Sequence, residues 1–195
     1  MSKEVSMLNT GIHSRHRAMC AVATILFALE LHTARANAQQ GGAPTDPQIV
    51  GIVGIADQID IDYARLALSK AKDQQVKDFA HQMMIDHASV QKSVNDLSAK
   101  LNVTPADSGT SDSLKAQAQQ MMQKLRGLSG KEFEKAYIDN EVAYHQRVIN
   151  AIKTVLIPNA RNAELKKALQ GAEPLFEGHL QHAQRVQAAV QRSGL

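Results

Sequence analysis

The 195-residue sequence contains no tryptophan, few aromatic residues of any kind (4%), and only 11 glycines and 5 prolines. A hydrophobic core must therefore be built from alanine, leucine, isoleucine, valine and methionine, which suits packing between helices. The scarcity of glycine and proline argues against a turn-rich β fold. The composition thus predicts an all-α protein, and the length predicts a single domain.

Cysteine is almost absent: Cys20 is the only one, and it lies in the first 38 residues. This segment carries basic residues, then an apolar run over 18–29, then the sequence ANA at 36–38. That order predicts a secretory signal peptide over 1–38, cleaved after Ala38, and hence a location in the periplasm or cell envelope. The apolar run is short for a membrane span, and an uncleaved signal anchor is the alternative.

The rest of the chain lacks a strong charge of either sign. The leader holds four of the 22 basic and two of the 19 acidic residues, so its removal lowers the formal net charge from +3 to +1. No basic cluster with interleaved aromatic residues remains, and we expect no nucleic-acid partner. Association with the cell envelope or membrane is the expected partner class. Without cysteine, the mature chain can form neither a disulfide nor a thiolate site.

Hydrophobic residues recur with a helical period along the chain, and this pattern predicts four long helices after a flexible linker at 39–47. Asp73 is the predicted N-cap of the second helix, and Pro158 is expected to end the third. The predicted helices span 48–70, 74–101, 130–157 and 163–192, with a short extra helix at 114–126.

These elements predict an all-α fold, a ferritin-like antiparallel four-helix bundle over 48–192. The long connection between the second and third helices, 102–129, carries the extra helix. It can return the chain along the bundle, as a ferritin-like crossover does. An up-down-up-down bundle with an overhanging short helix is the alternative.

Polar residues interrupt the apolar stripes of three helices at similar heights. His87 lies between Met83 and Val90 in the second helix, where the helical period calls for an apolar residue. Glu141 and His145 face inward on adjacent turns of the third helix, and His179 faces inward on the fourth. The sequence predicts one mid-bundle layer of these four residues, with a carboxylate from the first helix, Asp60 or Asp62, at its rim.

Burying such a layer without partners would cost several kcal/mol, so each polar group needs a partner. One solution is a network of hydrogen bonds among histidines, carboxylates and water. The other is a metal ion, since three imidazoles and a carboxylate suit Zn²⁺ or Fe²⁺. His87, His145, His179 and Glu141 are therefore the candidate metal ligands. No phosphate-binding loop, CxxC or nucleophile elbow occurs, and we predict no catalytic residues.

Three stretches carry a family resemblance: LALSKAKDQQVKDFAHQMMIDH, LRGLSGKEFEKAYIDNEVAYHQRVI and EPLFEGHLQHAQ. Together they resemble the bacterial domain-of-unknown-function family 4142, whose members are often labelled predicted outer-membrane or membrane proteins. The resemblance covers about residues 48–190. It implies an exported ferritin-like domain whose characteristic histidines correspond to His87, His145 and His179. It brings no established activity.

Ferritin-like folds also suggest a di-iron site, but that site needs inward Glu-x-x-His motifs, which this chain lacks. A ferroxidase or iron store is therefore not the expected function. We predict an exported helical domain of the cell envelope that acts in binding or stress protection. A transition-metal protein that uses the mid-bundle histidine cluster is the alternative.

Overall fold

The computed structural model describes residues 42–193, all of whose regular structure is helical. The predicted signal peptide, its cleavage site and Cys20 lie outside the described residues. The helices are α1 (Asp46–Lys70), α2 (Gln74–Leu101), α3 (Gly109–Gly127), α4 (Gly130–Ala151), the π-helical turn η1 (Ile152–Leu156), α5 (Ile157–Asn159) and α6 (Ala163–Ser193).

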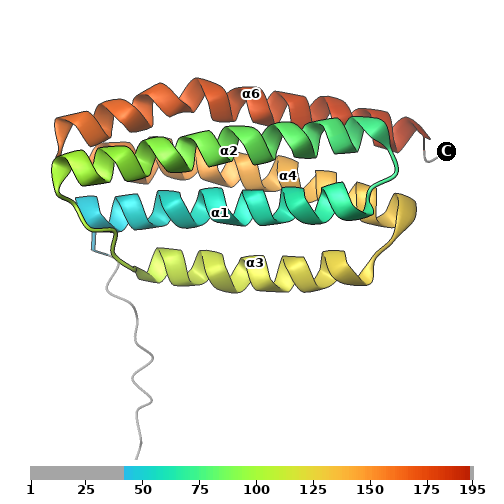
Figure 1. Ribbon diagram of the computed structural model, residues 1–195, viewed down its shortest axis with the longest axis horizontal. Helices are drawn as coiled ribbons and strands as arrows, with labels where there is room; N and C mark the ends of the chain where they lie inside the picture. The colour runs from blue at the N-terminus through green and yellow to red at the C-terminus, as the bar shows by residue number, and fades with distance from the viewer. Residues whose placement is uncertain (1–41, 194–195) are drawn as a thin grey trace, which may run out of the picture. The chain divides into compact units, whose positions relative to one another are not determined.

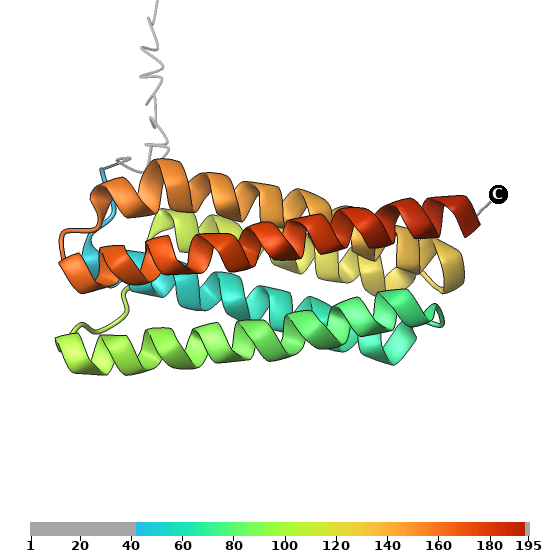
Figure 2. The ribbon, with the colours of Figure 1, turned by 90° about the horizontal axis from the view of Figure 1, so that it is seen from above.

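The long helices form two hairpins, α1–α2 and α4–α6, which lie side by side in a bundle (Figures 1 and 2). Among α1, α2, α4 and α6, the pairs that pack against each other are antiparallel, whereas α3 runs parallel to α1 (Figure 1). The predicted all-α four-helix bundle is therefore confirmed. Asp73 caps α2 as predicted, because its carboxylate accepts from the backbone N–H groups of Gln75 and Val76.

The connection between α2 and α4 returns the chain along the bundle. α3 runs beside α1 from one end of the bundle to the other (Figure 1). Glu134, in the second turn of α4, accepts from the backbone N–H groups of Lys72 and Asp73 at 2.6 and 2.8 Å. α4 therefore starts at the end of the bundle where α2 starts, and these two helices are parallel. The chain has the crossover, not the up-down-up-down alternative.

The opposite end of the bundle is fastened in the same way. Asp46, the first residue of α1, accepts from the backbone N–H groups of Arg161 and Asn162 at 2.8 and 2.9 Å. Each hairpin turn thus has its free amides satisfied by a carboxylate from the other hairpin. These paired clamps fix the axial position of one hairpin against the other, and with it the heights of the side chains between them.

One predicted helix boundary was wrong. α3 begins at Gly109 rather than at 114, because Ser108 and Ser111 bond each other's side chains and backbone and cap the helix early. The third helix ends at Asn159, as predicted from Pro158 and Asn159. Before this end it widens into η1, where the N–H of Ile157 reaches the carbonyl of Ile152.

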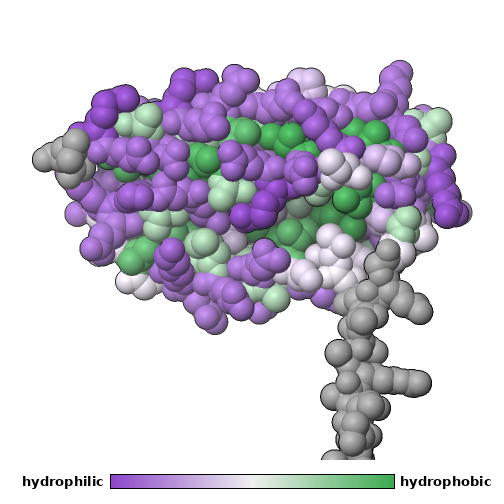
Figure 3. Space-filling model, turned by 180° about the vertical axis from the view of Figure 1, so that it is seen from behind, coloured by the Kyte–Doolittle hydropathy of each residue, from purple (hydrophilic) through white to green (hydrophobic). Residues whose placement is uncertain are grey.

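The surface of the described region is mainly hydrophilic. Figure 3 shows the face opposite that of Figure 1, where apolar side chains lie in the gaps between hydrophilic ones. Among the described residues, the exposed large apolar side chains are Ile85, Val155 and Leu175. No helix within 42–193 is both long enough and apolar enough to cross a membrane.

Candidate metal centre

Three imidazole rings meet in the middle of the bundle. His87 comes from α2, His145 from α4 and His179 from α6, and each is 4% exposed or less. Their ring centroids are 5.2 to 5.7 Å apart, with His87 closest to His179. Each ring offers a nitrogen that lies within 4.8 Å of those of the other two. The predicted layer is therefore present, and it spans both hairpins.

One nitrogen of each imidazole is held by a partner outside this cluster. Nδ1 of His87 donates to Asp57 Oδ1 at 2.8 Å, and Nε2 of His179 donates to Asp86 Oδ2 at 2.9 Å. Nδ1 of His145 donates to the backbone carbonyl of Glu141 at 3.0 Å. These bonds use one nitrogen of each ring and leave His87 Nε2, His145 Nε2 and His179 Nδ1 for a second partner. None of the three has a hydrogen-bond partner.

Two carboxylates are completely buried beside the rings. Asp60 on α1 and Glu141 on α4 are both 0% exposed, and all four of their oxygens lack a hydrogen-bond partner. Asp60 Oδ2 lies 3.5 Å from His87 Nε2 and 3.7 Å from His145 Nε2. Polar atoms buried without partners are rare in proteins and call for an explanation such as a bound ion.

Burial decides the direction of the pKa shift at Glu141, Asp60 and His145. It raises the pKa of Glu141 well above its usual range, with a further increase from the charge of Asp60. Burial also raises the pKa of Asp60 to about 6, although His87 opposes the shift. The pKa of His145 falls to about 3 through burial and the nearby His87 and His179. His145 is thus neutral near pH 7, as a metal ligand must be.

The surroundings of the layer exclude water. All three tyrosines of the sequence are buried near it, and burial together with Glu141 and Asp60 raises the pKa of Tyr63 to about 12. Tyr144 packs edge-on against His145, with ring centroids 6.2 Å apart. Phe176 contacts both His87 and His179. The side chain that connects the layer to solvent is Asp86, which is 21% exposed.

The structure corrects the expected contribution of the first helix to the layer. Asp60 lies inside the layer, not at its rim, and Asp62 is half-exposed and pairs with Arg65 at 3.2 Å. Asp57 and Asp86 orient two of the imidazoles and were not predicted from the sequence. The spacing of three residues between Asp57 and Asp60 was the available signal, since it puts both carboxylates on one side of a helix.

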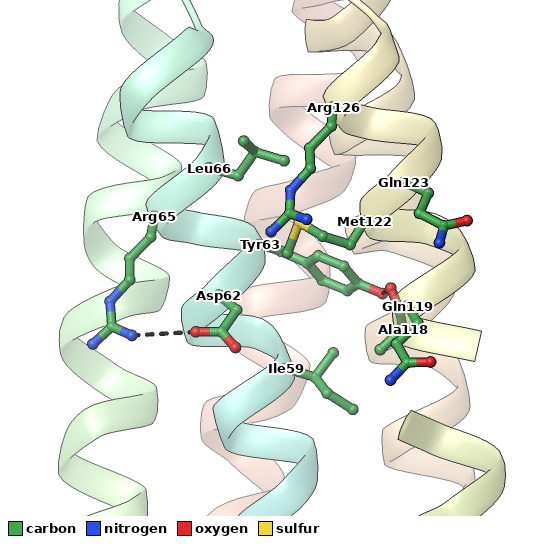
Figure 4. Close-up of a pocket in the computed structure, with 10 residues that line it drawn as sticks. All are labelled: Ile59, Asp62, Tyr63, Arg65, Leu66, Ala118, Gln119, Met122, Gln123 and Arg126. Atoms are coloured by element: carbon green, nitrogen blue, oxygen red, sulfur yellow. Dashed lines mark hydrogen bonds and ion pairs between the residues drawn. The ribbon is translucent and has the colours of Figure 1, made fainter. Parts of the chain in front are cut away.

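A groove at the surface is separate from the layer. The groove, of about 600 Å³, lies between α1 and α3, and Asp62, Tyr63 and Arg126 are among its lining residues. Figure 4 shows Tyr63 projecting from α1 toward α3, with Arg126 above its ring. Its lining includes neither the three imidazoles nor Asp60 and Glu141. The layer is therefore enclosed rather than open to a substrate-sized cleft.

Comparison with known proteins identifies the family. Residues 31–186 match the model of a family described as "Domain of unknown function (DUF4142)", so the chain belongs to it. The resemblance found in the sequence is thereby confirmed. No curated protein and no solved structure matches the chain.

Proposed function

We propose that this protein is an exported metal-binding domain that holds a first-row transition metal ion, such as Zn²⁺ or Fe²⁺, in the centre of its helical bundle. One observation carries the proposal. Three imidazole nitrogens that lack partners converge from three helices, while the other nitrogen of each ring is already held by a carboxylate or carbonyl. Metal-binding histidines in proteins are oriented in this way.

The ligand atoms are then His87 Nε2, His145 Nε2 and His179 Nδ1, with Asp60 as the nearest carboxylate. Three imidazoles and a carboxylate match the nitrogen and oxygen preference of Zn²⁺ and Fe²⁺. A purely structural network of hydrogen bonds explains the layer less well. In a direct network the free nitrogens would bond to Asp60, yet its Oδ2 lies 3.5 Å from His87 Nε2 and 3.7 Å from His145 Nε2, beyond the usual hydrogen-bond distance.

The enclosure of the layer favours binding over catalysis of a reaction on an organic substrate. The ligands come from both hairpins, so a bound ion also joins the α1–α2 hairpin to the α4–α6 hairpin. Holding or buffering a metal ion in the cell envelope fits the wider expectation of a binding or stress-protective module.

The proposal is tested by adding Zn²⁺, Co²⁺ or Fe²⁺, the last without oxygen, to metal-free protein made without a polyhistidine tag. We expect the melting temperature to rise with at least one of these ions, because an ion that binds only the folded protein stabilises it. His87→Gln removes a ligand and should abolish the rise. His81→Gln is the matched control, since His81 is exposed on the same helix. An unchanged melting temperature with every ion would refute the proposal.

Export is the second part of the proposal, and it rests on the order of basic, apolar and small residues in 1–38. The intact mass of protein recovered from the periplasm is the test. A mass that corresponds to a chain starting at Gln39 supports cleavage after Ala38. A mass that retains residues 1–38 would instead support a signal anchor.

A further inference from the structure

The potential ligands of the central layer fall into two overlapping sets. One set consists of His87, His145 and His179, and the other consists of Asp60, Glu141 and His145. Within each set the potential ligand atoms all lie within 4.8 Å of one another. The set that contains Glu141 includes neither His87 nor His179. A single ion centred on the three imidazoles therefore leaves Glu141 aside.

Glu141 needs a partner of its own. Its side chain is 0% exposed, and neither Oε1 nor Oε2 has a hydrogen-bond partner. Oε2 approaches His145 Nδ1 at 3.6 Å, but that nitrogen already donates to the Glu141 backbone carbonyl. A buried carboxyl group without a partner is costly, and a cation beside it removes that cost.

Asp60 belongs to the second set and also lies beside the first. Its Oδ2 is 3.5 Å from His87 Nε2 and 3.7 Å from His145 Nε2, and its Oδ1 is also without a partner. A carboxylate with two free oxygens can bind one ion through each of them. Ions that share a carboxylate in this way are about 3.5–4 Å apart in known two-metal sites.

The number of free donors also exceeds the need of one ion. The layer contains three imidazole nitrogens and four oxygens of Asp60 and Glu141 that are buried without partners. A tetrahedral ion uses only four ligands. A second ion uses the remaining oxygens and satisfies the atoms that one ion leaves without a partner.

We propose that the layer is a two-ion centre, in which Asp60 bridges an ion held by imidazoles and a second ion held by Glu141. The inference rests on the proposed function, because it requires that the layer binds metal at all. The ligands are oxygen and nitrogen only, so the centre takes first-row divalent cations such as Mn²⁺, Fe²⁺, Co²⁺ or Zn²⁺. Each hairpin contributes potential ligands to both sets.

The experiment is a titration of the untagged, metal-free protein with Co²⁺, followed by its visible absorption and by metal analysis after gel filtration. We expect two ions per chain in the unmodified protein and one in Glu141→Gln, which keeps the size of the side chain. Glu132→Gln, an exposed position on the same helix, is the control and keeps both ions.

The possible outcomes separate the two proposals. No bound ion in the unmodified protein contradicts both the proposed function and the second ion. One ion in the unmodified protein overturns the two-ion centre and leaves metal binding intact. Two ions that persist in Glu141→Gln place the second ion elsewhere and also overturn it.

A measurement on the unmodified protein tests the two-ion centre even if the variant misfolds. When the protein is saturated with Mn²⁺, two ions that share Asp60 are magnetically coupled, and we expect a broad electron paramagnetic resonance signal. A six-line spectrum of isolated Mn²⁺ would overturn the two-ion centre.

Discussion

Replacement of Asp60 by asparagine should have opposite effects on metal binding and on the stability of the metal-free protein. Asp60 is 0% exposed, and burial raises its pKa from 3.8 to about 6. One pKa unit corresponds to about 1.4 kcal/mol. Ionisation of Asp60 at pH 7 therefore costs the native state about 3 kcal/mol relative to the unfolded chain.

Asp60→Asn removes this charge and leaves a buried amide, which costs roughly 1–3 kcal/mol where it finds no partner. The metal-free variant should thus be as stable as the unmodified protein at pH 7, or more stable by up to about 2 kcal/mol. That difference corresponds to an increase in melting temperature of up to about 8 °C, at roughly 2–4 °C per kcal/mol. The same variant should lose most of the metal-induced rise, which is about 2.7 kcal/mol at 100 times Kd.

Asp60 also makes the stability of the metal-free protein depend on pH. Between pH 3.8 and 6 the native state binds more protons at Asp60 than the unfolded state does, so the contribution of Asp60 to stability falls as pH rises through this range. The advantage of Asp60→Asn should accordingly shrink as the pH is lowered from 7 to 4. Thermal melts of both proteins, with and without Co²⁺, measure all of these effects.

Asp62→Asn is the matched control, because Asp62 lies two residues away with a half-exposed side chain. Its effect should remain within about 0.5 kcal/mol. A large loss of stability in metal-free Asp60→Asn at pH 7, with metal binding unchanged, would refute the reasoning. Asp60 would then act as a structural ion-pair partner of His87.

Further predictions concern the orientation of His87, the pH dependence of metal binding and the packing of the crossover on α1. Asp57→Asn should weaken metal binding about 10- to 100-fold, because the carboxylate that orients His87 is lost. Calorimetry measures the affinity, and an unchanged value would contradict this role of Asp57. Metal affinity should rise from pH 6 to 8, because an ion must displace protons from Glu141 and His87. Burial raises the pKa of Glu141, whereas at His87 the charges of Asp60 and Asp57 outweigh burial and raise the pKa. An affinity independent of pH would argue against ligation by these groups. Gly51→Ala should destabilise the fold by roughly 1–3 kcal/mol through overpacking, because its Cβ would lie 2.2 Å from the backbone oxygen of Ala106. At Gly54 the new Cβ would meet open space, so Gly54→Ala should stabilise the helix by about 0.5–1 kcal/mol. Equal melting temperatures for the two variants would show that the crossover does not pack on α1 as described.

Much of the architecture was predictable because helix formation is governed by nearby residues. The starts and ends of α2 and α6 agree with the prediction to within one residue, and Asp73 caps α2. His87, His145 and His179 were selected by the helical period alone. That selection succeeded because α2, α4 and α6 each bury essentially one face, so the apolar stripe indicates which side points inward.

The period failed on α1 for a physical reason. α1 lies between α2 and α3 and is covered on more than one side (Figure 1), so its buried residues do not form a single stripe. Asp57 and Asp60 are buried there among isoleucines, and no apolar stripe marks them as inward-facing. The choice between Asp60 and Asp62 therefore required the position of α3, which covers the outer side of the helix.

Composition and the 3.6-residue period were enough to predict that the chain is helical, where its long helices lie, and which three histidines face the core. The packing of the helices was needed to establish that α2 and α4 are parallel, that Asp57 and Asp86 orient the imidazoles, and that Asp60 lies beside both His87 and His145. These contacts join residues 27 to 93 positions apart. They depend on how each helix is rotated and shifted against its neighbours, which the end clamps of Asp46 and Glu134 establish and which no local pattern encodes.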